Sequence, residues 1–174
     1  MKSQKIIIDT ADTIWIDIKK EISHLSPRKS LQDWLSDDFD KTSDRQSFAR
    51  NQILAVLLEG EKVISFGVMG QDKVLVKSFS TILWLPVETS AMACFLYTRE
   101  EERGHGYAEH LKKEQLKYMK EKGYTHLIWF TSSESYKDLY IWYGAQIIET
   151  NEEQDNQIRN ILGDEKTYMY VYIL

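Results

Sequence analysis

The chain has 174 residues, of which 43% are apolar, 12% aromatic and 28% charged. These values are typical of one globular domain with its own core, and they exclude a disordered, collagen-like or solenoid protein. The 22 Lys and Arg residues against 27 Asp and Glu residues give a net charge of −5. This charge argues against a nucleic-acid-binding protein with a basic surface.

The sequence gives no sign of a membrane segment or an internal disulfide. No apolar stretch approaches the roughly 20 residues that span a bilayer, and the first residues do not resemble a signal peptide. The single cysteine, Cys94, cannot pair within the chain, and its apolar surroundings favour a buried, inert thiol. A cytoplasmic protein is therefore expected.

The first part of the chain is predicted to supply two helices and several strands. Isoleucines spaced by three or four residues predict an amphipathic helix over 14–25, and a second helix is expected over 29–36. Apolar runs rich in Val, Ile, Leu and Phe favour strands, two of which flank a turn at 59–61 and predict a hairpin. The strands expected here are 5–9, 53–58, 62–69, 74–84 and 91–98.

The second part begins with the longest predicted helix, over 104–122, with Gly123 at its C-terminal cap. Strands are expected at 125–131, 145–149 and 167–174, a short helix at 135–143, and a loop or frayed helix at 151–164. This order predicts a mixed α/β fold with a mostly antiparallel sheet of six to seven strands and helices on both faces.

The most informative segment is the junction 98–108, between a predicted strand and the long helix. The first amides of a helix have no intrahelical partner, and Gly104 and Gly106 allow an anion to approach the main chain. Arg103 and His105 add positive charge beside them. The junction is therefore a candidate phosphate site; the alternative is an ordinary tight turn.

Two better-known phosphate loops are excluded by their spacing. The third glycine of a dinucleotide-binding fingerprint would fall at Glu109, and no Gly-Lys-Ser or Gly-Lys-Thr sequence occurs. Neither a Rossmann-type NAD site nor a P-loop is therefore supported.

The junction resembles the acetyl-CoA motif of the GNAT superfamily of N-acetyltransferases, which reads Arg or Gln, any two residues, Gly, any residue, then Gly or Ala. Here Arg103, Gly106 and Ala108 occupy the defined positions. A second motif of this superfamily has an aromatic residue and Tyr, any three residues, then Gly and an aromatic residue. Tyr140 and Gly144 match it, whereas Leu139 and Ala145 stand at the two aromatic positions. The resemblance extends over 53–174 and is weak over 1–52.

The resemblance implies one domain over 1–174, in which 53–174 form the sheet and the acetyl-CoA-binding core and 1–52 lie on the acceptor side. Main-chain groups of Leu96, Tyr97 and Thr98 would bind the pantetheine arm, and Ser133 would join the cofactor site. No metal is implied. The residues expected to hold the CoA diphosphate are Arg103, Gly104, His105, Gly106, Tyr107 and Ala108.

The resemblance also implies that Tyr140 is the general acid that protonates the leaving CoA thiolate. A free phenol has a pKa of about 10 and is protonated at neutral pH. The alternative is that Tyr140 only packs a short helix on the sheet. The general base is open: the family position is Met92, and Glu88, Glu59 or a water chain could replace it.

The expected activity is transfer of an acetyl group to a primary amine by direct attack on the thioester. The alternative is a non-catalytic acyl-CoA-binding or interaction module on the same fold. The net negative charge is compatible with a small cationic amine or a lysine-rich peptide as acceptor. Glu100, Glu101 and Glu102 are unfavourable beside a diphosphate unless they face water. No nucleic acid or membrane partner is expected, and a homodimer is left open.

Overall fold

The computed structural model describes residues 4–9, 52–70, 73–131, 137–162 and 168–174. These residues belong to two compact units. The first comprises residues 1–70 and 95–115, and the second comprises residues 71–94 and 116–174. Strand β4 (Ser90–Thr98) and helix α5 (Tyr107–Glu121) each contribute residues to both units.

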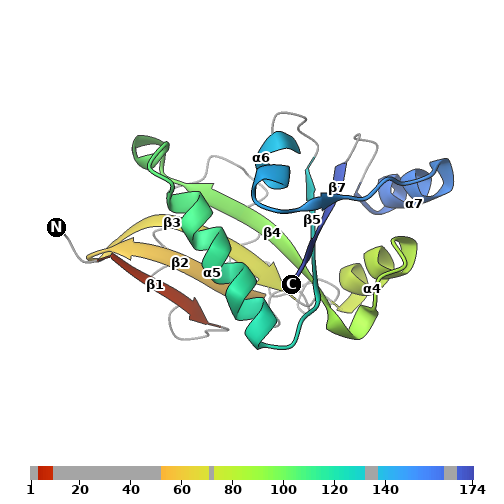
Figure 1. The fold of residues 1–174 in the computed structure, drawn as a ribbon, viewed down its shortest axis with the longest axis horizontal. Coiled ribbons are helices and arrows are strands. Elements are labelled where there is room, and N and C mark those ends of the chain that lie inside the picture. The colour runs from red at the N-terminus through yellow and green to blue at the C-terminus, as the bar shows by residue number, and fades with distance from the viewer. Residues whose placement is uncertain (1–3, 10–51, 71–72, 132–136, 163–167) are drawn as a thin grey trace, which may run out of the picture. The chain divides into compact units, whose positions relative to one another are not determined.

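The first unit is built on an antiparallel sheet (Figure 1). Strands β1 (Gln4–Asp9), β2 (Gln52–Glu59) and β3 (Lys62–Gly70) follow one another in it, with the end of β4 beside β3. Strands β2 and β3 form a hairpin in which Glu59 pairs with Lys62 around Gly60. Buried apolar side chains from both strands, such as Val56 and Phe66, form the core of this unit.

The second unit combines parallel and antiparallel strand pairs. The start of β4 pairs in parallel with β5 (His126–Thr131), and β5 pairs antiparallel with β7 (Tyr168–Ile173). The two-residue strand β6 (Gln146–Ile147) pairs with β7 at the edge.

Helices cover both faces of the sheet in the second unit. Helices α4 (Lys73–Ile82) and α7 (Glu152–Leu162) pack on the face that carries Ile128 and Val171, where they form a buried apolar cluster. Helix α6 (Lys137–Trp142) packs on the opposite face through Tyr140, whose ring contacts Trp129 and Tyr170. Successive side chains of β5 and β7 point to opposite faces of the sheet. Ile128 and Val171 therefore face α4 and α7, whereas Trp129 and Tyr170 face α6.

The structure confirms the expected mixed α/β fold and most of its elements. Together the described residues supply seven strands, mostly in antiparallel pairs. The hairpin, the strand before the glycine loop and the long helix lie where the sequence predicts them. The predicted helices over 14–25 and 29–36 lie outside the described residues. Among the residues described, no helix is long and apolar enough to cross a membrane.

The strand predicted over 74–84 is wrong, because this segment forms helix α4. Val76, Phe79 and Leu83 are buried at the spacing of one helix face, whereas Val74 and Thr81 are exposed. The β-branched and aromatic composition of the segment favours a strand, but packing on the sheet decides for a helix.

The polar segment 151–164, expected as a loop or frayed helix, contains the ordered helix α7. Its start is fixed by two reciprocal hydrogen bonds. The main-chain N–H of Asn151 donates to Gln154 Oε1 at 3.0 Å, and that of Gln154 donates to Asn151 Oδ1 at 2.9 Å. This capping box supplies the local signal for a helix in a sequence with few apolar residues.

Candidate functional site

The candidate site in the first unit is the turn that joins β4 to α5. Strand β4 ends at Thr98 and is followed by a 3₁₀ turn, Glu100–Glu102. Gly104 and Gly106 then have φ angles of 82° and 79°, which lie in the left-handed region. Side chains with a Cβ rarely adopt this conformation, so both positions require glycine for the turn to close.

The amides at the start of α5 are available to a ligand. The first intrahelical hydrogen bond runs from the His110 N–H to the Gly106 carbonyl at 3.0 Å, so the N–H groups of Tyr107, Ala108 and Glu109 precede the helical ladder. A Cβ built on Gly104 or Gly106 would meet no atom within 4 Å. The exposed main chain is thus open to an anion at the positive end of the helix dipole.

Two arginines fix the turn to the sheet of the same unit. The main-chain N–H of Arg99 donates to the Ile64 carbonyl at 3.0 Å, and its Nε donates to the Val63 carbonyl. The Nε of Arg103 donates to the Thr98 carbonyl at 3.3 Å. These bonds connect the turn to β3 and to the end of β4, which holds the glycines at a defined place.

His105 lies exposed in the glycine turn. Its Nδ1 is 3.2 Å from the Glu102 carbonyl oxygen, and its ring stacks on Tyr107 with 5.8 Å between centroids. Arg103 can bring positive charge to an anion bound at the turn, and the exposed imidazole of His105 offers a further polar group there.

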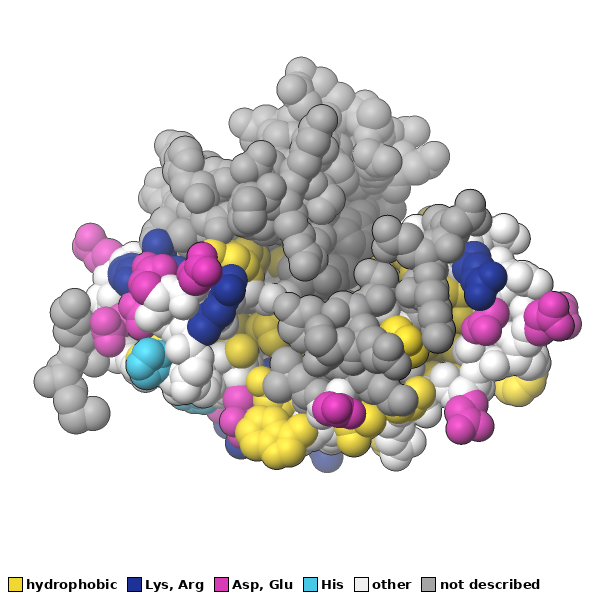
Figure 2. Space-filling view, turned by 90° about the horizontal axis from the view of Figure 1, so that it is seen from above, with side chains coloured by type: hydrophobic (Ala, Val, Ile, Leu, Met, Phe, Trp, Pro, Cys, Tyr) yellow, Lys and Arg dark blue, Asp and Glu magenta, His cyan; other side chains and the backbone are white. Residues whose placement is uncertain are grey.

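Two of the three consecutive glutamates form ion pairs with basic side chains. Lys62 Nζ lies 2.7 Å from Glu102 Oε1 and 3.4 Å from Glu101 Oε1, and Arg99 Nη1 lies 3.8 Å from Glu101. Figure 2 shows acidic and basic side chains gathered with a histidine in this region. The pairing counters the negative charge that the sequence places beside the turn, so a diphosphate is less disfavoured there.

The pKa values of this group reflect the same contacts. The hydrogen bond with Glu102 raises the pKa of Lys62 above its usual value. A main-chain hydrogen bond lowers the pKa of the Glu101 carboxyl, and Lys62 and Arg99 lower it further. Both groups therefore stay charged throughout the neutral range.

The residues predicted to bind pantetheine, Leu96, Tyr97 and Thr98, form the end of β4 in the same unit. The Tyr97 carbonyl accepts a hydrogen bond from Ser65 Oγ at 2.6 Å, and the Ser65 and Thr98 hydroxyls lie 2.9 Å apart. The ring of Tyr97 packs on Phe66 at 5.4 Å. The structure thus brings the predicted cofactor residues of β4 and of the glycine turn together in one unit.

Tyr140 belongs to the second unit, on α6. Only 8% of its surface is exposed, and its ring lies 5.3 Å from that of Trp129 and 5.1 Å from that of Tyr170. Burial, together with Tyr140 and Tyr143, raises the pKa of the nearby Tyr172. A fixed ring suits a proton donor and also suits packing, so the contacts are compatible with both interpretations of Tyr140.

The remaining predicted site residues include Glu88 and Ser133. Glu88, the candidate base, is exposed in a 3₁₀ turn, Val87–Thr89, directly before β4 in the second unit. Ser133 lies outside the described residues. Within the part of the chain that the structure describes, no group of three or more His, Cys, Asp or Glu side chains could hold a metal ion.

Sequence reasoning missed three basic residues of the first unit. Lys62 and Arg99 hold the glutamates and the turn, but their partners lie far away in sequence, so no local pattern reveals them. Lys112 on α5 is 1% exposed, and burial lowers its pKa well below the usual value. The sequence contains a signal for the burial of Lys112, because Ala108, Leu111 and Lys112 share one face at helical spacing.

The sequence pattern of the Acetyltransferase (GNAT) family matches residues 16–141 of the chain. A comparison with curated proteins found no match.

Three solved structures illustrate the likeness of the fold. A GNAT family acetyltransferase from Elizabethkingia anophelis with acetyl-CoA bound has 17% identity and a TM-score of 0.62, with 100% of both chains covered. An IAA acetyltransferase from Bacillus cereus has 15% identity and a TM-score of 0.60, covering 99% of this chain and 100% of its own. A Bacillus subtilis acetyltransferase in complex with CoA has 13% identity and a TM-score of 0.59, covering 99% of each chain.

Proposed function

The chain belongs to the Acetyltransferase (GNAT) family, whose pattern matches more than half of it, and from this premise we propose that it is an acetyl-CoA-dependent N-acetyltransferase acting on a primary amine. Solved structures of the same fold contain acetyl-CoA or CoA, which supports the choice of acyl donor. The acceptor and the chemical step belong to the proposal.

The open start of α5 is the observation that carries this proposal. Two left-handed glycines expose the main chain, and the first amides of the helix precede its hydrogen-bond ladder. In the proposal these amides bind the diphosphate of CoA, with Arg103 and His105 supplying positive charge beside it. An ordinary strand-to-helix turn does not need the flanking Arg103 and His105.

The pantetheine arm is assigned to the main chain of Leu96, Tyr97 and Thr98. An extended ligand can bind a strand as an added strand does, with few special side chains. The carbonyls of Tyr97 and Thr98 already accept hydrogen bonds from Ser65 and Arg103. The proposal therefore uses only main-chain groups that those bonds leave available.

The chemical step requires a neutral amine and a protonated leaving group. The bound thioester supplies the acetyl group that the amine nitrogen attacks, and positioning of the two reactants can remove up to about 7 to 11 kcal/mol of the barrier. Tyr140 donates its phenolic proton to the departing thiolate, and Glu88 or a water takes the proton from the amine. Each proton thus has a donor and an acceptor without a metal.

Binding and turnover together test the proposal. Titration calorimetry with acetyl-CoA should show binding, and release of free thiol should follow when a polyamine, an aminoglycoside or a lysine-rich peptide is added. Binding without turnover on any amine would contradict the enzyme and favour a non-catalytic acyl-CoA-binding module. Absence of binding would contradict both.

Tyr140→Phe tests the assigned proton donor. We expect kcat to fall about 100-fold or more with little change in acetyl-CoA affinity, because general acid catalysis typically contributes 10² to 10⁴ in rate. The matched control is Tyr143→Phe, which removes a hydroxyl from the same α6 region and should leave kcat within about twofold. Equal turnover for Tyr140→Phe and the parent would remove Tyr140 from the mechanism.

A further inference from the structure

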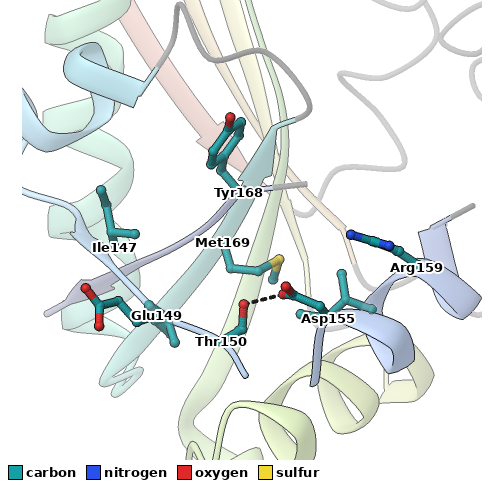
Figure 3. A pocket seen from close by; sticks show the side chains of 9 residues that line it. Ile147, Glu149, Thr150, Asp155, Arg159, Tyr168 and Met169 are labelled. Atoms are coloured by element: carbon teal, nitrogen blue, oxygen red, sulfur yellow. Dashed lines mark hydrogen bonds between the residues drawn. The ribbon is translucent and has the colours of Figure 1, made fainter. Parts of the chain in front are cut away.

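The second unit contains a cavity of about 380 Å³ between the segment that follows β6, helix α7 and the start of β7 (Figure 3). This volume lies in the range of small-ligand sites. None of its residues takes part in the function proposed above. The lining residues are Ile147, Ile148, Glu149, Thr150, Asp155, Ile158, Arg159, Tyr168 and Met169.

The inner wall of the cavity is apolar and firmly placed. Ile158 and Met169 are 3% and 2% exposed and belong to the core cluster of the second unit, and Ile148 packs against the same cluster. The Ile148 N–H donates to the Met169 carbonyl at 3.2 Å. A ligand would therefore find a preformed apolar surface rather than a flexible one.

The start of α7 is fixed independently of any ligand. Asn151 and Gln154 form the capping box described above, and the side-chain amide of Gln154 donates to the Ile82 carbonyl of α4. The cavity wall that α7 supplies is thus held by bonds to its own unit, which reduces the ordering cost of binding.

Two opposite charges on α7 line the cavity. Asp155 and Arg159 are four residues apart, so they lie on one face of the helix with Cβ atoms about 5 to 6 Å apart. The Asp155 carboxylate accepts a hydrogen bond from Thr150 Oγ1. Figure 3 shows this bond and the Arg159 side chain on the same side of the helix. Arg159 forms no ion pair with any residue in the described ranges, so its guanidinium is available.

We propose that this cavity binds a free α-amino acid with an apolar side chain. The ligand ammonium would bind Asp155 and the ligand carboxylate would bind Arg159, because an α-amino acid carries its two charges as close together as this helix face presents their partners. The apolar side chain would cover Ile148, Ile158 and Met169. The site does not depend on acetyl transfer.

The charges around the cavity favour a zwitterion over a simple anion. Asp155 and Arg159 line the cavity from the same helix, whereas the carboxylate of Glu149 points away from both (Figure 3). A phosphate or a plain carboxylate would meet Arg159 but would be repelled by Asp155. An ammonium group on the ligand turns that repulsion into attraction.

Methyl NMR of the full chain with defined probes tests the proposal without relying on activity. L-leucine should shift the methyl signals of Ile158 and Met169 in a saturable way. Leucinamide, which lacks the carboxylate, and 4-methylpentanoate, which lacks the amine, should each bind at least about tenfold more weakly. No saturable shift at about 10 mM L-leucine, or equal binding of all three probes, would overturn the proposal.

Variants of α7 give the second arm. Arg159→Gln and Asp155→Asn should each weaken L-leucine binding about tenfold, since each removes one charge-assisted contact. Arg159 is exposed, and asparagine at 155 can still accept the bond from Thr150, so both variants should fold. Glu153→Gln changes a charge on the same helix outside the cavity and should leave binding unchanged. Equal affinity of Arg159→Gln and the parent would overturn the proposal.

Discussion

The starts of α5 and α7 solve the same physical problem in opposite ways. Every helix begins with amides that have no intrahelical partner. At α7 the side chains of Asn151 and Gln154 satisfy such groups reciprocally. At α5, within the part of the chain that the structure describes, no side chain caps the first turn, and Gly104 and Gly106 leave open space around it.

The difference shows that helix starts can be assigned to stability or to ligand binding by what surrounds them. Helix α7 has three acids in its first turn, which complement the dipole and would repel an anion. At α5 the single first-turn acid, Glu109, is paired with Lys113 at 2.6 Å. A closed start therefore stabilises the fold, and an open start flanked by cations is suited to a diphosphate.

Gly106→Asp is the change that should break the open start most completely. We expect acetyl-CoA affinity to fall by at least about 100-fold, because a carboxylate would enter the anion site and the left-handed φ of 79° disfavours a side chain. Calorimetry measures the affinity directly.

Gly60→Asp is the matched control for this change. Gly60 also has a positive φ, of 64°, and open space around its Cβ position, but it lies in the β2–β3 turn. Its substitution should leave acetyl-CoA affinity within about twofold. Equal losses in both variants would attribute the effect to strain rather than to the anion site.

Asn151→Ala should break the closed start and leave the open one intact. Loss of a helix cap typically costs about 1 kcal/mol, which corresponds to a fall in Tm of about 2 to 4 °C for a chain of this size. Thermal unfolding followed by circular dichroism measures the shift. Unchanged stability would contradict the contrast between the two helix starts. So would weaker acetyl-CoA binding under conditions in which the variant is fully folded.

Arg103→Gln should sharpen the account of the open start. The guanidinium donates to the Thr98 carbonyl and lies at the rim of the glycine turn, so its removal should weaken acetyl-CoA binding about fivefold. The difference from the parent should shrink at high salt, because exposed charges are screened. A loss that does not depend on salt would indicate that Arg103 acts through packing.

Lys62→Met is expected to have the smallest effect, about a twofold loss of acetyl-CoA affinity near neutral pH. It releases the charges of Glu101 and Glu102 beside the turn. Since the pKa of Glu101 is lowered and that of Lys62 raised, the pairing is complete between the two values. The pairing is lost as the pH falls through the pKa of Glu101 or rises through the pKa of Lys62.

The pH dependence of Lys62→Met relative to the parent is therefore the diagnostic. The difference in acetyl-CoA affinity should diminish as Glu101 becomes protonated at acidic pH. Lys120→Met, a substitution on the exposed surface of α5, serves as the control and should show no difference at any pH. A constant difference down to acidic pH would exclude Glu101 as its cause.

The sequence predicts the open start of α5 better than the closed start of α7. Glycines in a turn and a family motif at 103–108 are local signals, and the structure gives them the expected backbone. The capping box at 151–154 is also local, but the polar composition of α7 conceals it unless the spacing of Asn151 and Gln154 is examined.

Other features depend on contacts that no local pattern contains. The pairing of Lys62 with Glu102 joins residues 40 positions apart. Helix α4 carries strand-like residues, and its burial against Met92 and Ile128 decides its conformation. The catalytic assignments of Tyr140 and Glu88 stay predictions, because ring contacts and exposure alone do not identify a proton donor or a base.

The most direct test of the central claim is amide NMR of the full chain during titration with CoA, and with pantetheine, which lacks the diphosphate, as the control. The account predicts large shifts of the Gly106, Tyr107 and Ala108 amides with CoA, none of comparable size with pantetheine, and unchanged signals for Asn151 and Gln154. Unshifted α5 amides, or equal shifts with both ligands, would contradict the assignment of the open helix start as the diphosphate site.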